Sequence, residues 1–192
     1  MERLYRATDK NPYHLSTVGI LFNAKNEVVF HHYKSKRWKQ IDAEWRHYST
    51  LLSETLRDGE APEEAVIRGA KEEFNVSAQV VCFLGAGITV VPSNSGSFQK
   101  TSLYFVLKVL GDGLPHSTEE GAVAYSLNLY ELRRLLERQH SRGVGAGADG
   151  LDGLLRLGED KLHRLPNTIA EECEVDCDCA LCSDDIERAF PA

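Results

Sequence analysis

The sequence predicts an α/β protein, because segments with strand character alternate with two amphipathic helical segments. Residues 13–22 are rich in β-branched and aromatic side chains, which is typical of a strand. Residues 101–110 alternate and then become continuously apolar, which predicts a central strand. Helical patterns cover residues 62–75 and 129–139. The strand segments and the two helices together indicate one layered domain.

The helical segment that begins at Pro62 has signals at both ends. Proline suits the first helical position, where its missing N–H costs no hydrogen bond. Asn75 tolerates the left-handed conformation that often closes a helix. The apolar face is formed by Ala65, Val66, Ala70 and Phe74. We therefore expect a helix that packs this face on a sheet.

Charged residues in and around this helix follow a fixed spacing. Arg68 stands eight positions after Glu60, and the adjacent acids Glu72 and Glu73 follow it. With Ala70 and Val76 as aliphatic positions, the stretch from Glu54 to Val76 resembles the Nudix box, G-x5-E-x7-R-E-U-x-E-E-x-G-U, where U is aliphatic. The spacing is kept along the whole motif. The resemblance extends over roughly residues 13–140.

Three positions depart from the pattern. Glu54 stands at the opening glycine, Gly69 replaces the glutamate after the arginine, and Asn75 replaces the late glycine. In the family, carboxylates at positions 69, 72 and 73 bind divalent cations, so Gly69 leaves a ligand position without a side chain. Glu54 changes a loop whose backbone carbonyl commonly helps to hold the metal.

The resemblance implies Mg²⁺ or Mn²⁺ as the cofactor, held by Glu72 and Glu73. Two acids are enough for one Mg²⁺, because substrate phosphates and waters complete its octahedron. Glu60 is the expected partner of Arg68, which would orient the loop.

An acidic loop at Glu119 and Glu120 precedes the second predicted helix, whose apolar stripe is Leu132, Leu135 and Leu136. In several Nudix proteins a glutamate of this loop is the general base. Either glutamate could take that role, whereas acids in loops are commonly only solvated. Both are kept as catalytic candidates with Glu72 and Glu73.

Residues ahead of the motif are candidates for binding substrate. Arg37 and Lys39 belong to a basic loop. Two interpretations are open: the loop binds substrate phosphate, or it is only a solvated turn. Trp45 could stack on a nucleobase, since every base has a π-face, or could be a half-buried strand residue.

The implied fold is a Nudix-like α/β/α sandwich, with a mixed β-sheet between the two helices. The implied activity is metal-dependent hydrolysis of the pyrophosphate in a nucleoside diphosphate linked to another group. The partner is then a small nucleotide or diphosphate substrate. The alternative is a Nudix-fold nucleotide-binding module whose catalysis is weakened or lost because of Gly69.

Composition argues against other classes of partner. The net charge of −7 provides no basic footprint for duplex nucleic acid. No apolar run reaches the length of a membrane span, and the first residues lack the apolar region of a signal peptide. We expect a soluble, cytoplasmic protein.

The C-terminal part has a different character. A glycine-rich stretch from residue 143 predicts a linker, so we expect a hydrolase domain at 1–142 and an acidic extension at 143–192. Four of the five cysteines lie close together, at Cys173, Cys177, Cys179 and Cys182. They are either reduced thiols, a Zn²⁺ site or local disulfides. A Zn²⁺ site would favour a role in protein interaction.

Overall fold

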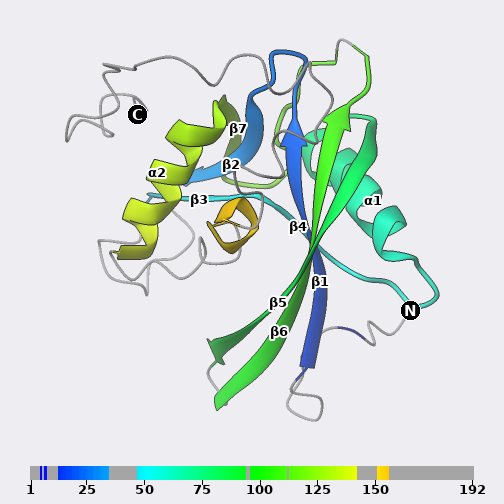
Figure 1. The fold of residues 1–192 in the computed structure, drawn as a ribbon, viewed down its shortest axis with the longest axis vertical. Coiled ribbons are helices and arrows are strands. Elements are labelled where there is room, and N and C mark those ends of the chain that lie inside the picture. Colours follow the sequence, from blue (N-terminus) through cyan, green and yellow to red (C-terminus); the bar gives the residue numbers. More distant parts are fainter. Residues whose placement is uncertain are drawn as a thin grey trace. The chain divides into compact units, whose positions relative to one another are not determined.

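The computed structural model describes residues 5, 7, 13–34, 47–93, 96–111, 113–141 and 151–155 (Figure 1). Its strands are β1 Tyr13–Phe22, β2 Val28–Lys34, β3 His47–Thr50, β4 Leu52–Thr55, β5 Ala78–Ser93, β6 Gly96–Val109 and β7 Ala122–Leu127. Its helices are α1 Pro62–Phe74 and α2 Leu129–Ser141. The two predicted helices are both present at the expected places.

The described strands form one mixed sheet. Its main path is β3-β2-β1-β6-β5, with β4 paired to β1 and β7 paired to β2. Strands β1 and β6 are parallel, with Tyr13 opposite Gln99 and Phe22 opposite Lys108, while the other pairs are antiparallel. The predicted central position of residues 101–110 is confirmed, because β6 lies between β1 and β5.

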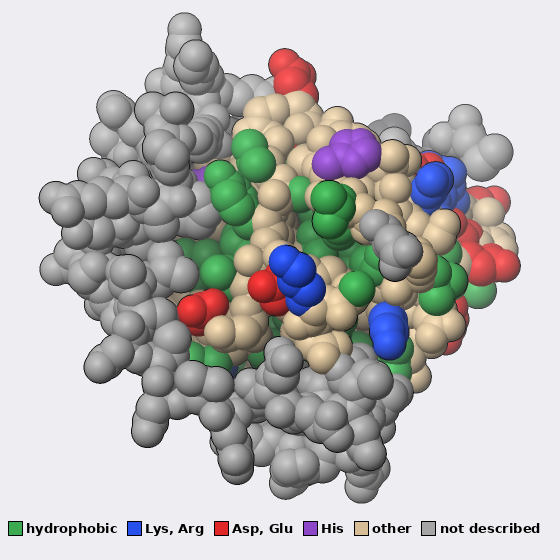
Figure 2. All heavy atoms as spheres, turned by 90° about the horizontal axis from the view of Figure 1, so that it is seen from above, with side chains coloured by type: hydrophobic (Ala, Val, Ile, Leu, Met, Phe, Trp, Pro, Cys, Tyr) green, Lys and Arg blue, Asp and Glu red, His purple; other side chains and the backbone are tan. Residues whose placement is uncertain are grey.

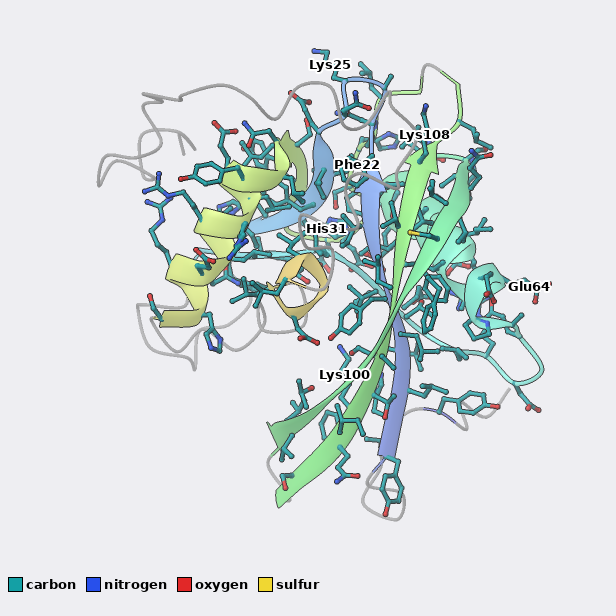
Figure 3. All side chains as sticks on the ribbon, in the orientation of Figure 1. Phe22, Lys25, His31, Glu64, Lys100 and Lys108 are labelled. Atoms are coloured by element: carbon teal, nitrogen blue, oxygen red, sulfur yellow. The ribbon has the colours of Figure 1, made fainter. Side chains whose placement is uncertain are left out.

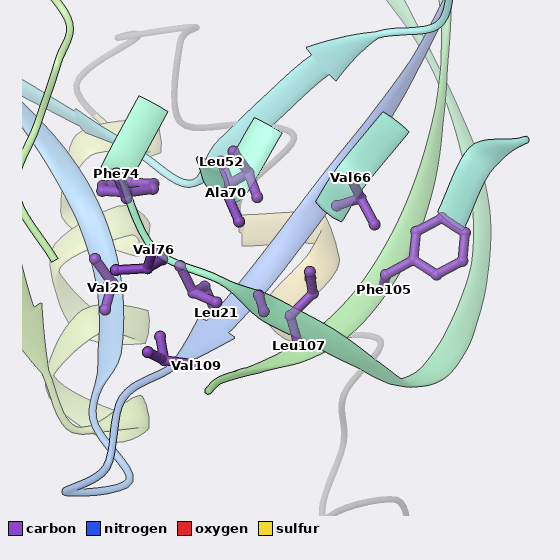
Figure 4. Packing of buried hydrophobic residues seen from close by; sticks show 11 residues of the cluster. Leu21, Val29, Leu52, Val66, Ala70, Phe74, Val76, Phe105, Leu107 and Val109 are labelled. Atoms are coloured by element: carbon purple, nitrogen blue, oxygen red, sulfur yellow. The ribbon is translucent and has the colours of Figure 1, made fainter. Parts of the chain in front are cut away.

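Helix α1 covers one face of the sheet. Phe74, Ala70 and Val66 are fully buried and pack with Leu21 of β1 and Leu107 of β6 (Figure 4). Close approach is helped by Gly19, where an added Cβ would lie 3.1 Å from Val66 Cγ2 and nearer still to two leucines. The predicted apolar face of this helix is therefore confirmed.

Helix α2 lies on the opposite face, where it contacts β3 and β7. Leu132 and Leu136 are fully buried. Gln139 joins the helix to β3 by accepting from the Ser49 N–H at 2.6 Å and donating to the Ser49 carbonyl at 2.8 Å. With one helix on each face, the predicted α/β/α sandwich is confirmed.

Strand β5 is long and irregular. Residues 78–83 and 87–91 have strand character as two separate segments, whereas β5 runs without a break from Ala78 to Ser93. Register shifts occur between Val80 and Cys82 and between Phe83 and Gly85. Such bulges interrupt the alternation of side chains between the two faces of the sheet. The sequence of β5 therefore shows two short alternating patterns, although the strand is continuous.

A helical turn at residues 151–155 belongs to the same compact unit, which ends at Gly158. Leu151 and Leu154 are buried, and an added Cβ at Gly153 would lie 3.0 Å from Tyr104 Cδ1 of β6. The predicted division at residue 142 stays a prediction, and these buried leucines are the first observation to set against it. The described helices include none that is long and apolar enough to cross a membrane.

Truncation tests this boundary. Ending the chain after Arg142 should lower the free energy of unfolding by about 3–5 kcal/mol, since two buried leucines are lost at roughly 1.5–3 kcal/mol each. Ending it after Gly158 keeps both leucines and should change stability little. Urea unfolding of the two truncated proteins and the full chain measures the difference. Equal stability of all three would support the boundary at 142.

Candidate active site

Arg68, on α1, is the centre of a network of carboxylates. Its side chain is only 14% exposed. It donates from Nε to Glu60 Oε1 at 2.7 Å and from Nη2 to Glu60 Oε2 at 3.0 Å. It also donates from Nη1 to Glu54 and, at 2.9 Å, to Glu72, and from Nη2 to the Thr55 carbonyl. One arginine thus ties the helix to β4 and to the loop that follows β4.

Glu72 lies on the exposed side of this network. Its side chain is 48% exposed and also accepts two hydrogen bonds from Arg57 Nη2, at 2.9 and 3.1 Å. Burial opposes its ionisation, but the hydrogen bonds from Arg68 and Arg57 outweigh that effect and lower the pKa of Glu72. Glu72 is therefore an ionised carboxylate at neutral pH.

Glu73, the next residue, has a different environment. Its side chain is 12% exposed, and its Oε2 lies 2.9 Å from Nε2 of His31, a residue of β2 that is 1% exposed. Figure 3 shows His31 in the interior, in contrast to Glu64, which points away from the sheet on the outer side of α1. The His31 ring also stacks on Phe74, with centroids 4.1 Å apart.

Burial sets the protonation of this pair. It raises the pKa of Glu73 to about 8, with the charge of Glu119 acting in the same direction, and it lowers the pKa of His31 to about 4. Near pH 7 without a cation, Glu73 is therefore mostly protonated and His31 is neutral. A protonated Glu73 donates to His31 Nε2, which leaves the Nδ1–H of His31 to donate to Ser117 Oγ, 3.1 Å away.

The loop that contains Glu119 is fastened to the C-terminal end of α1. The His116 N–H donates to the Phe74 carbonyl at 3.1 Å, and the Thr118 N–H donates to the Glu73 carbonyl at 2.9 Å. The Thr118 hydroxyl donates to the carbonyls of Glu72 and Glu73. These contacts satisfy carbonyls that the end of a helix leaves unpaired. The loop that they hold contains Glu119, whose charge acts on Glu73.

The contribution of Thr118 can be measured. Thr118→Val should lower stability by about 1 kcal/mol, the net value of an intramolecular hydrogen bond, and should slow any hydrolysis because the loop is held less firmly. Ser141→Ala is the matched control, because it removes a similar hydroxyl-to-carbonyl bond at the end of α2. Both changes should lower Tm slightly. An equal effect of both on hydrolysis would contradict the role of Thr118.

The space around Gly69 is occupied by neighbouring side chains. Gly69 is buried where α1 meets β4, and a Cβ added there would lie 2.7 Å from Glu54 Cγ and 3.0 Å from Leu52 Cδ1. The expectation that Gly69 leaves a ligand position without a side chain stays a prediction, and the structure adds that the side chain of Glu54 takes the adjoining space.

The remaining sequence candidates are placed as follows. Glu119 and Glu120 are both exposed in the described loop, and Glu119 is the one whose charge acts on Glu73 and His31. Outside the described residues lie Arg37, Lys39, Trp45, Cys173, Cys177, Cys179 and Cys182. On the face shown in Figure 2, basic and acidic side chains are interspersed among apolar and neutral atoms.

Metal ligands can be assessed from the donors that are present. In the described part of the chain, no three His, Cys, Asp or Glu side chains are already gathered around one point. Instead, Arg68 holds Glu54 and Glu72, and His31 holds Glu73. The donors themselves fit a hard divalent cation, because Mg²⁺ and Mn²⁺ take carboxylate oxygens. A cation would have to replace the Arg68 and His31 contacts.

Sequence reasoning missed His31, Ser117 and Thr118. The pair His31–His32 was a signal, since alternation along a strand places one histidine on each face. His31 faces Phe74 and Glu73, whereas His32 Nδ1 lies 3.0 Å from Ser49 Oγ. Ser117 and Thr118 carried no comparable signal, because their partners are backbone and side-chain atoms that only the fold brings close.

Comparison with known proteins identifies the family of the chain. The sequence model of the NUDIX domain matches residues 12–144, more than half of the chain. The chain therefore belongs to the Nudix family, as the box from Glu54 to Val76 indicated. A search of curated proteins gave no match.

The chain is also similar to solved structures, and the first one described here has a TM-score above 0.5 and supports the fold. A Caenorhabditis elegans Ap4A hydrolase in a binary complex is 14% identical with a TM-score of 0.51, covering 74% of this chain and 93% of that chain. A NUDIX hydrolase from Nitrosomonas europaea is 14% identical with a TM-score of 0.47, covering 64% and 77%. A MutT structure from work on Aliivibrio salmonicida and Vibrio cholerae is 17% identical with a TM-score of 0.43, covering 73% and 94%.

Proposed function

We propose that this chain is a divalent-metal-dependent hydrolase that cleaves the pyrophosphate of a nucleoside diphosphate linked to another group. Membership of the Nudix family supports the general class of reaction. The observation that carries the proposal for this chain is the convergence of Glu119 and Glu73. They come from separate elements, and the Glu119 loop is held on the end of α1 by hydrogen bonds from the His116 N–H, the Thr118 N–H and the Thr118 hydroxyl.

Glu72 and Glu73 are the residues proposed to hold Mg²⁺ or Mn²⁺, which when bound offsets charge on the pyrophosphate and polarises water. Glu119 is proposed to accept a proton from the attacking water, whose oxygen joins phosphorus as the bridging P–O bond breaks. Glu120 is the second candidate for this base. Arg68 positions Glu72 and the Glu60 loop by its hydrogen bonds and does not itself need to touch the substrate.

The experiment is a Mg²⁺ and Mn²⁺ screen for phosphate or nucleotide release from dinucleotides, nucleotide sugars and nucleoside triphosphates. Hydrolysis of at least one class that requires the cation, and that falls when Glu119 is changed to Gln, is the expected result. Hydrolysis that proceeds equally well in EDTA would overturn the proposal.

A nucleotide-binding module is the second candidate. It is favoured by the absence of a ready-made metal cluster among the described residues and by the glycine at position 69. Nucleotide binding measured by calorimetry, with no turnover of any substrate in either cation, would select this reading.

A further inference from the structure

Two departures from the box pattern face each other in space. The pattern has glycine at position 54 and glutamate at position 69, and this chain has the two residue types the other way around. Glu54 lies on β4 and Gly69 on α1, and a Cβ at Gly69 would approach Glu54 Cγ to 2.7 Å and Glu54 Cβ to 3.2 Å. Positions that look independent in sequence therefore share one small space.

A side chain at position 69 and the side chain of Glu54 cannot both be accommodated at this point unless one of them shifts. The missing side chain of Gly69 gives the room that Glu54 occupies, and a glutamate on the helix would require a small residue on the strand. From this exchange we infer that Glu54 supplies, from β4, the metal-binding carboxylate that the family pattern places on the helix at position 69. This inference rests on the proposed metal-dependent function.

The contacts of Glu54 place its carboxylate beside Glu72. Arg68 Nη1 donates to Oε2 of Glu54 and also to Oε2 of Glu72, so the two carboxylates meet at a single nitrogen. Glu54 is only 23% exposed, while Glu72 opens to solvent at 48%. A cation that enters from the Glu72 side can therefore be met by both carboxylates.

The same short strand also reaches Glu73. The backbone of Ser53, the residue before Glu54, acts on the Glu73 carboxyl group and lowers its pKa, against the larger effect of burial. Strand β4 is thus linked to both adjacent box acids, to Glu73 by Ser53 and to Glu72 by way of Arg68. When Glu54 and Glu72 turn to the cation, Arg68 keeps Glu60 and the Thr55 carbonyl as partners.

A direct test is Mn²⁺ binding without substrate, followed by electron paramagnetic resonance and calorimetry. Glu54→Gln keeps the shape of the side chain and an oxygen that can accept from Arg68, so the fold is preserved. It should weaken Mn²⁺ binding at least about tenfold, because one charged ligand of the cation is lost. Glu60→Gln is the matched control, since Glu60 is equally a buried partner of Arg68, and it should leave Mn²⁺ affinity within about twofold.

Exchanging the two residues gives a second readout. Gly69→Glu alone should lower Tm, because its side chain collides with Glu54, and Glu54→Gly alone should weaken Mn²⁺ binding. The double variant, Glu54→Gly with Gly69→Glu, should recover both Tm and Mn²⁺ affinity. Such recovery is non-additive and is expected only if the two positions are coupled.

The outcomes separate this inference from the proposed function. If Glu72→Gln weakens Mn²⁺ binding and Glu54→Gln does not, Glu54 is only a partner of Arg68 and the inference fails alone. If the unaltered protein does not bind Mn²⁺, the proposed function fails with it. A double variant that remains as impaired as the single ones would also overturn the exchange.

Discussion

Glu73→Gln and Glu72→Gln are each expected to lower metal-dependent hydrolysis about a hundredfold, which corresponds to a few kcal/mol of activation free energy. Each carboxylate has few companions in this chain, so the loss of one leaves the cation poorly held. Glu73→Gln also removes the acid that lies against His31 and on which the charge of Glu119 acts. Initial rates over a range of Mg²⁺ concentrations measure the effect.

Glu63→Gln is the control for this pair. Glu63 is an exposed acid in the first turn of the same helix, distant from the carboxylates at its other end. It should leave the rate and its Mg²⁺ dependence unchanged. Full activity of both Glu72→Gln and Glu73→Gln, with circular dichroism showing an intact fold, would rule out these acids as the catalytic metal ligands.

Arg68→Met is expected to cause the largest loss of stability, about 3–5 kcal/mol in the free energy of unfolding. Removing a buried partner leaves charges uncompensated, and here Glu54 and Glu60 are only 23% and 13% exposed. Urea unfolding should show a lower midpoint. Mg²⁺ should restore part of the lost stability, because a cation bound to the folded state offsets the same carboxylates.

Arg57→Met tests whether the effect of Arg68→Met comes from the burial of Arg68 or only from the loss of a positive charge. Arg57 also pairs with Glu72, but both side chains are about half exposed, so its loss should cost less than about 1 kcal/mol. If both arginine variants lose the same small amount, the Arg68 network does not stabilise the fold in the way its burial implies.

Much of the fold could be predicted from local signals. Pro62 and Asn75 marked the ends of α1, and Asn75 does adopt the left-handed conformation, with φ of 53°. Strand β4 was not predicted, because four residues are too few to show an alternating pattern, and its identity depends on pairing with β1.

In the candidate site, too, some residues could be predicted from local sequence and others could not. Glu72 and Glu73 could be proposed from spacing, because a motif within one helix is a local property. The contact of His31 with Glu73 and the packing of Glu54 on Gly69 could not, since each joins separate elements. The two departures were visible in the sequence, but only the distance between them shows that they share one space.

The parallel pairing of β1 with β6 has a consequence for how the chain reaches its native state. Residues of β1 pair with residues nearly half the chain away, starting at Tyr13 and Gln99. Closing such a long loop reduces the conformational entropy of the chain before the stabilising contacts between the strands form. This slows folding. On the ribosome, the first strand must wait for β6 to be synthesised, so the edge of β1 that pairs with β6 stays open during that interval. Chaperone dependence and aggregation during refolding should therefore be governed by the docking of β6 rather than by helix formation.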